Sequence, residues 1–346
     1  MRSTRRRTRL FAILAVLALT ATACGNGDTN EPDDATDADA ATEETEATDA
    51  DDTEATDDET ADASDVTIGL ALSTLQNPFF VTLRDGAQAA ADEAGATLSV
   101  SDAQDDAQQQ ADDIQDFITQ AVDVILINPV DSAAIVPSIE AANEAGIPVF
   151  TVDRGADGGE VVTHIASDNV LGGRLAAEYL FEQVGGEGTV AQLEGVPGAS
   201  ATNDRGQGFQ EALDGATGIE LASSQTANFN REEGYNVAQN LFQATSDLAG
   251  IFAQNDEMAL GAVEAAEEAG LTDLVIVGFD ATDDALAAIA DGRMAGTVAQ
   301  QPALMGELGV DLAVDFLVEG QELTPIVPVE VAVVTTANVD DFLPES

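Results

Sequence analysis

Residues 124–154 read VILINPVDSAAIVPSIEAANEAGIPVFTVDR, and this stretch decides the fold class. Two runs of apolar residues, at 124–127 and 147–152, have the length of buried strands. Between them, residues 133–145 are rich in alanine with helical spacing, and Gly146 follows where a helix C-cap is expected. The stretch therefore predicts a strand, a helix and a second strand, which is the repeating unit of a parallel sheet.

The same alternation extends in both directions along the chain. Alanine-rich segments end at Gly95 and Gly270, as helices do. Continuous apolar strands separated by helices indicate a sheet that is buried on both faces. About ten such units are more than one sheet comfortably holds, so the sequence predicts an α/β protein with two domains. Further strands are predicted at 66–72, 190–193, 250–253, 274–279 and 329–334.

The first 24 residues have the layout of an export signal. Five arginines within residues 2–9 precede an apolar run at 10–19, which is too short to span a bilayer. Small residues follow, and then Cys24, the only cysteine in the chain. This layout resembles a bacterial lipoprotein signal, in which Cys24 would carry the lipid after cleavage. The alternative is an ordinary secretory signal followed by a bystander cysteine.

Residues 25–64 consist almost wholly of Asp, Glu, Thr and Ala, with 17 acidic residues and no basic one. Such a segment cannot bury enough apolar surface to offset its chain entropy, and its like charges repel one another. We expect a disordered acidic tether between the lipid and the folded body. A calcium-binding role is the alternative, although no EF-hand spacing is present.

The charge of the chain excludes one class of protein. Its 65 acidic residues stand against 11 basic ones, for a formal charge of -54, and it has no lysine. Binding of nucleic acid requires cationic groups, so that class is excluded. An acidic surface suits concentrated salt, and genome bias is the alternative explanation.

Enzyme classes find little support in the sequence. One histidine and one cysteine cannot build a usual zinc site, and no nucleophile elbow is present. Paired aspartates in a cleft can also serve a glycosidase, and this alternative stays open.

Polar side chains and phenylalanines follow several predicted strands. Ligands of open α/β sheets bind beyond the carboxyl ends of the strands. Side chains that form two hydrogen bonds, together with aromatic rings, suit a small polyol. The candidates found in this way are Ser73, Asn77, Phe79, Phe80, Asp153, Arg154, Arg205, Asn255, Asp280 and Gln300.

Several long motifs resemble those of the bacterial ribose-binding proteins, which belong to the type I periplasmic binding proteins. They are STLQNPFF at 73–80, DR at 153–154, HIASDNVLGG at 164–173, FAQNDEMALG at 252–261 and VGFD at 277–280. The resemblance covers residues 65–336. It implies two Rossmann-like lobes with parallel sheets, joined by a three-segment hinge that closes over a sugar. It also adds two contacts, Phe229 and Phe279, to the candidates above.

The resemblance further implies an organisation and a set of partners. The first lobe would comprise 65–167 plus 301–329, and the second 168–300 plus 330–346. The protein would be a monomeric substrate-binding lipoprotein on the outer face of the cytoplasmic membrane. It would need no cofactor and would deliver D-ribose to an ABC permease with its cytoplasmic ATPase. Alternative ligands are allose, galactose, arabinose and furanosyl signalling molecules, and the chain could also serve a chemoreceptor.

Some candidates have a plainer explanation. Phe79 and Phe80 could be core residues, although two adjacent rings are not expected to face the same core. Asp153 and Asp280 could be helix N-caps. We expect His164, the single histidine, to be structural.

Overall fold

The computed structural model describes residues 63–343 of the chain. The predicted signal at 1–24, Cys24 and nearly all of the tether at 25–64 lie outside this range. Among the described residues, none of the helices has the length and apolarity that crossing a membrane requires.

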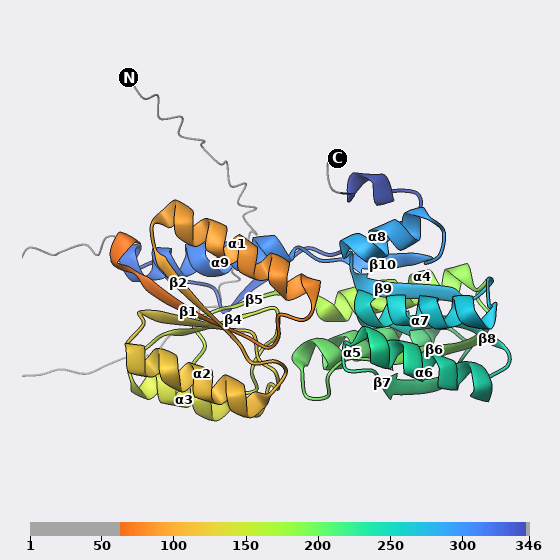
Figure 1. The fold of residues 1–346 in the computed structure, drawn as a ribbon, viewed down its shortest axis with the longest axis horizontal. Coiled ribbons are helices and arrows are strands. Elements are labelled where there is room, and N and C mark those ends of the chain that lie inside the picture. Colours follow the sequence, from red (N-terminus) through yellow and green to blue (C-terminus); the bar gives the residue numbers. More distant parts are fainter. Residues whose placement is uncertain (1–62, 344–346) are drawn as a thin grey trace, which may run out of the picture. The chain divides into compact units, whose positions relative to one another are not determined.

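Two six-stranded sheets form the framework, as the alternating pattern predicts (Figure 1). The first sheet is parallel throughout, and we call the part built on it the first lobe. Its strand order is β11 (Ile326–Val329), β5 (His164–Ser167), β4 (Val149–Val152), β3 (Val124–Ile127), β1 (Thr67–Leu72) and β2 (Thr97–Asp102).

The second sheet is parallel except at one edge, and the part built on it is the second lobe. At that edge β12 runs antiparallel to β10. The strand order is β12 (Ala332–Thr335), β10 (Gly296–Ala299), β9 (Val275–Asp280), β8 (Leu248–Ala253), β6 (Gly188–Glu194) and β7 (Ile219–Thr226). The predicted fold class, two α/β lobes with largely parallel sheets, is confirmed.

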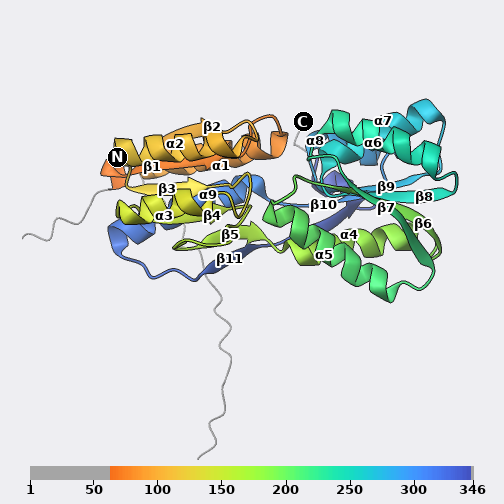
Figure 2. The same ribbon diagram turned by 90° about the horizontal axis from the view of Figure 1, so that it is seen from below.

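Paired helices cover both faces of each sheet (Figures 1 and 2). In the first lobe they are α1 (Pro78–Ala94) with α9 (Pro302–Val314), and α2 (Ala107–Gln120) with α3 (Val136–Glu144). In the second lobe they are α4 (Asn169–Gln183) with α5 (Ser200–Gly215), and α6 (Arg231–Ala244) with α7 (Asp256–Ala269) and α8 (Asp283–Ala290). The central strands are therefore buried on both sides, which explains their unbroken apolar runs.

The chain passes between the lobes three times. After β5 ends at Ser167, α4 packs against the second sheet. After β10 ends at Ala299, α9 packs against α1 of the first lobe. The predicted single strand at 329–334 is wrong, because this run contains the third crossing. Its first residue ends β11 in the first sheet, and its last three residues lie in β12 of the second.

Two glycines allow α4 and α5 to approach each other closely. A Cβ atom on Gly173 would lie 2.2 Å from the backbone oxygen of Arg205. A Cβ atom on Gly208 would lie 2.0 Å from the backbone oxygen of Val170. Backbone cannot yield to such a contact, so both positions require glycine. The close packing of α5 on α4 fixes the position of Arg205 relative to α4.

Candidate functional site

A hollow between the lobes collects most of the predicted site residues. It encloses about 240 Å³ of empty space, including its open mouth. Ten of the twelve candidates line it, and Ala201 is the additional lining residue. The ten are Asn77, Phe79, Phe80, Asp153, Arg154, Arg205, Phe229, Asn255, Asp280 and Gln300.

Two carboxylates and two guanidinium groups face this hollow. Arg154 Nε lies 3.9 Å from Asp153 Oδ2, and Arg205 Nη1 lies 3.8 Å from Asp280 Oδ1. All four side chains are buried. Burial raises the pKa of Asp153 against the opposing effect of Arg154 and Arg205, and it raises the pKa of Asp280 against that of Arg205. The charges balance, so the hollow suits an uncharged ligand that is rich in hydrogen-bonding groups.

Hydrogen bonds from the lobes hold these four side chains in place. Arg205 Nε donates to Asn169 Oδ1 at 2.8 Å, and its Nη1 donates to the backbone oxygen of Gln254 at 2.6 Å. Gln300 Nε2 donates to Asp280 Oδ1 at 2.8 Å. Because Arg205 Nε, Arg205 Nη1 and Gln300 Nε2 all bond to the protein, Arg205 and Asp280 are oriented before any ligand binds.

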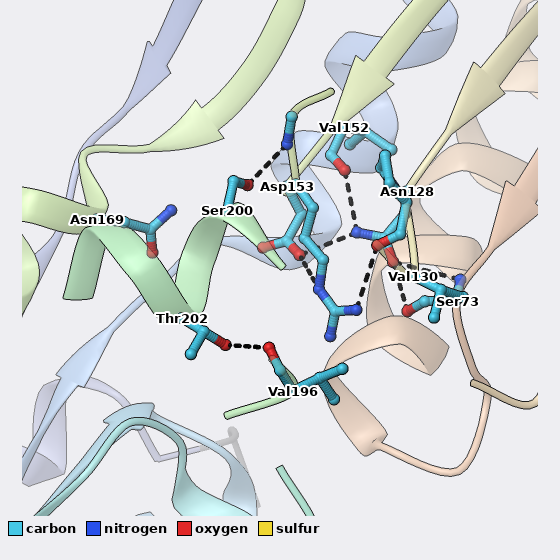
Figure 3. A network of polar contacts seen from close by, with 12 residues as sticks. Ser73, Asn128, Val130, Val152, Asp153, Asn169, Val196, Ser200 and Thr202 are labelled. Carbon is cyan, nitrogen blue, oxygen red and sulfur yellow. Dashed lines mark hydrogen bonds and ion pairs between the residues drawn. The ribbon is translucent and has the colours of Figure 1, made fainter. Parts of the chain in front are cut away.

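Asp153 is oriented by a chain of polar residues behind it (Figure 3). Asn128 Nδ2 donates to Asp153 Oδ2 at 3.0 Å and to the backbone oxygen of Val152 at 3.1 Å. Asn128 Oδ1 accepts from Ser73 Oγ at 2.7 Å and from Ser73 N at 3.3 Å. Ser73 thus lies behind the hollow and does not line it. Asn128 is not among the residues predicted for the site, although it directly follows the predicted strand at 124–127.

Two buried oxygen atoms at the hollow have no hydrogen-bond partner among the described residues. They are Asp153 Oδ1 and Gln300 Oε1, which belong to different lobes. Buried acceptors without partners are uncommon in folded proteins and call for a physical reason. Both atoms belong to residues that line the hollow, so a ligand with O–H or N–H donors would satisfy them.

Aromatic rings and arginines form the walls. Arg154 lies over the rings of Phe80 and Phe229, with 5.2 and 5.4 Å from its guanidinium carbon to the ring centroids. Arg205 lies 3.8 Å from the centroid of Phe279. Phe279 therefore supports Arg205 from behind, and it is not a lining residue.

Phe79 and Phe80 are both core residues and lining residues of the hollow. Both rings are buried in the hydrophobic cluster of the first lobe, and both line the hollow. The two rings meet edge to face, with their centroids 5.1 Å apart.

Several side chains differ from the roles weighed from sequence. Neither Asp153 nor Asp280 is a helix N-cap, whereas Asn77 and Asn255 cap α1 and α7 while lining the hollow. Arg205 lies in the second turn of α5.

His164 begins β5, and its Nδ1 lies 2.9 Å from Thr151 Oγ1, away from the hollow. Burial lowers the pKa of this imidazole. The contact with Thr151 lies within the first lobe, and the carboxylate of the lining residue Asp153 raises the imidazole pKa against burial.

Three lining residues have positive φ angles, which side chains other than glycine rarely adopt. They are Asp153 at 63°, Phe229 at 56° and Asp280 at 124°. Strained backbone of this kind persists only where the surrounding structure enforces it, and it clusters at binding sites.

The fold and the hollow together define a two-lobed binding protein. Residues 68–322 match the family described as the periplasmic binding protein domain, and the chain belongs to that family. Such proteins are extracytoplasmic.

Individual relatives are similar over most of their length. The ribose import binding protein RbsB of Haemophilus influenzae is 47% identical over 276 residues, which cover 80% of this chain and 93% of that protein. RbsB of Bacillus subtilis is 46% identical over 258 residues, or 75% and 84% of the two chains. The resemblance stated from the motifs is thereby confirmed. These relatives are transport binding proteins, not enzymes.

A solved structure shares the same architecture. The solute-binding protein of an ABC transporter from Mycobacterium smegmatis, with bound glycerol, has a TM-score of 0.78 at 34% identity. The match covers 81% of this chain and 98% of that one.

Proposed function

We propose that this chain is the extracytoplasmic receptor of an ABC sugar importer, and that it captures one monosaccharide, D-ribose, between its lobes. The relatives whose names specify ribose import are 46–47% identical to it, and they support ribose among the candidate sugars.

The observation that carries the proposal is the pair of unpartnered acceptors, Asp153 Oδ1 and Gln300 Oε1. A sugar presents several O–H donors on a compact ring, and it carries no charge to upset the balance of two aspartates and two arginines. Each hydrogen bond to a charged group contributes about 1.5–3 kcal/mol, so these groups would hold a sugar firmly.

The aromatic walls support the same class of ligand. One face of a sugar ring consists largely of C–H groups, which pack against aromatic rings. Phe80 and Phe229 come from different lobes and are bridged by Arg154. A ligand held by both walls would bind the closed arrangement better than an open one.

For the lobes we propose the boundaries predicted from the sequence, with the first lobe at 65–167 plus 301–329 and the second at 168–300 plus 330–346. The three chain crossings would act as the hinge. A hydrogen bond from Gln301 Nε2 to the backbone oxygen of Glu330, at 3.2 Å, joins two of the three segments. Motion at one segment would therefore be shared with its neighbour.

For the rest of the chain we propose removal of the signal at 1–24 and lipidation of Cys24. The segment 25–64 would then serve as a tether, and the protein would act as a monomer beside its permease. The motif order of the first 24 residues supports this arrangement.

The test is calorimetric titration of the purified protein with D-ribose, D-allose, D-galactose and L-arabinose. D-Ribose should bind tightest, with one site per chain. Gln300→Ala should weaken binding about two- to tenfold, because it removes one of the two acceptors that have no partner. The matched control is Gln210→Ala, an exposed glutamine on α5 that bonds only within its helix at Asp214. Absence of ribose binding, or tighter binding of another sugar, would refute the assignment.

A further inference from the structure

A contact outside the hollow also joins the two lobes. The backbone N–H of Gly155, in the first lobe, donates a hydrogen bond to Ser200 Oγ in the second at 2.8 Å (Figure 3). The backbone N–H of Ser132 donates to the backbone oxygen of Gly198 at 3.0 Å. We call these four residues the latch. None of them lines the hollow.

The first-lobe side of the latch is held rigid by its own hydrogen bonds. Ser132 Oγ donates to the backbone oxygen of Gly155 at 2.7 Å. The backbone N–H of Asp157 donates to the backbone oxygen of Ser132 at 2.8 Å. These bonds tie the loop after β3 to the loop after β4, so the two donors of the latch sit at a fixed spacing.

The second-lobe side is shaped to approach closely. Gly198 has a φ of 89°, and a Cβ atom there would lie 2.0 Å from Asp131 Oδ2 across the cleft. Thr202 Oγ1 donates to the backbone oxygen of Val196 at 2.8 Å and holds the loop before α5 (Figure 3). The neighbouring Ala199 is fully buried. The fit between the lobes here is therefore tight and includes backbone that only glycine allows.

We propose that Ser200 is an affinity-determining residue that acts without touching the sugar, by stabilising the closed arrangement of the lobes. This inference rests on the proposed function and deepens it. Opening the lobes would break the Ser200 bond, so the bond counts only in the closed state. It then raises the closed population and slows the release of bound sugar.

The latch makes a prediction that a contact to the sugar would not make. A neutral hydrogen bond contributes a small net stabilisation, so its loss should weaken D-ribose binding about two- to tenfold. The change should appear as faster dissociation, while the association rate stays within about twofold. Closure around the sugar should still occur, because the ligand contacts of both lobes remain.

The experiment compares wild type with Ser200→Ala by calorimetry and by stopped-flow release of D-ribose. Ser200→Thr retains the hydroxyl and should restore most of the affinity. Ser224→Ala is the matched control, because Ser224 is an exposed serine of the same lobe that bonds to Glu194 and not to the first lobe. The proposal is wrong if Ser200→Ala releases ribose at the wild-type rate, or if its loss of affinity comes from slower association.

The two proposals fail in different ways. If wild type binds ribose and Ser200→Ala behaves identically, only the latch is wrong. If wild type does not bind ribose, the proposed function falls. In that case the latch is tested by comparing the radii of gyration of sugar-free wild type and Ser200→Ala. The variant should have the larger radius, and equal radii would overturn the proposal.

Discussion

The variant Asp153→Asn tests the different roles of the two carboxylate oxygens of Asp153. In the structure Asn128 Nδ2 donates to Asp153 Oδ2, while Oδ1 has no partner among the described residues. An asparagine at position 153 must turn its oxygen toward Asn128, since two amide nitrogens cannot bond to each other. Asn128 cannot turn instead, because its own oxygen accepts two hydrogen bonds from Ser73. The new amide nitrogen is thereby forced toward the hollow, where an acceptor had been.

The magnitude follows from this exchange. The variant replaces one charged acceptor by a neutral donor, and a hydrogen bond to a charged group contributes about 1.5–3 kcal/mol. The dissociation constant for D-ribose should therefore rise about 10- to 150-fold. The lobe itself should survive, because the oxygen of the new asparagine keeps the hydrogen bond from Asn128 Nδ2. Arg154, at 3.9 Å, loses an ion-pair partner but keeps its bond to the backbone oxygen of Pro129.

Calorimetry with D-ribose measures the loss, and thermal unfolding without sugar checks the fold. Asp157→Asn is the control, because it makes the same chemical change at an exposed aspartate four residues away. Binding of Asp153→Asn within twofold of wild type would refute the reasoning. A fall in melting temperature large enough to account for the weaker binding would also count against it.

Three further outcomes are expected. Burial raises the pKa of Asp256 to about 7, so the stability of the wild-type fold falls as pH rises from about 4 to about 7. The melting temperature of Asp256→Asn relative to wild type should therefore increase across that window. An equal difference in melting temperature at pH 5 and pH 7.5 would contradict this. Residues 65–346 carry 48 acidic residues and 6 arginines, so the melting temperature should rise between low salt and about 1 M NaCl, and a flat response would disagree. Cys24→Ser should move the protein from the membrane fraction to the soluble fraction of fractionated cells, and continued membrane association would contradict lipidation.

The sequence predicts the central strands better than the edges. Residues 124–127 and 149–152 are buried on both faces and stand out as unbroken apolar runs. The edge strands β2 and β7 alternate apolar with polar residues, and they were missed. Most of β2 is only half-buried, and β7 is exposed at every second residue and at its end. The run at 329–334 misled for another reason, since two short strands of different sheets join there without a turn signal.

The site is predictable where a side chain follows a strand directly, and less so elsewhere. Asp153 and Asp280 stand at strand ends, and the structure brings them to one hollow. Whether they bind the sugar remains a prediction. Ser200 and Asn169 could not have been chosen, because their partners, Gly155 and Arg205, lie 45 and 36 residues away in the sequence. Such pairings depend on how the lobes pack, which a local pattern does not reveal.

The close pairing of α4 and α5 limits how this receptor can be redesigned. Side chains at the strand ends can be exchanged one at a time, and each exchange alters the ligand locally. Gly173 and Gly208 allow no comparable freedom, because a single added methyl group would meet backbone at 2.2 or 2.0 Å and push α5 outward. That shift would carry Ala201 and Arg205 away from the hollow together. Ligand specificity can therefore be changed through the side chains at the strand ends, provided that Gly173 and Gly208 are kept and the packing of α5 on α4 is unchanged.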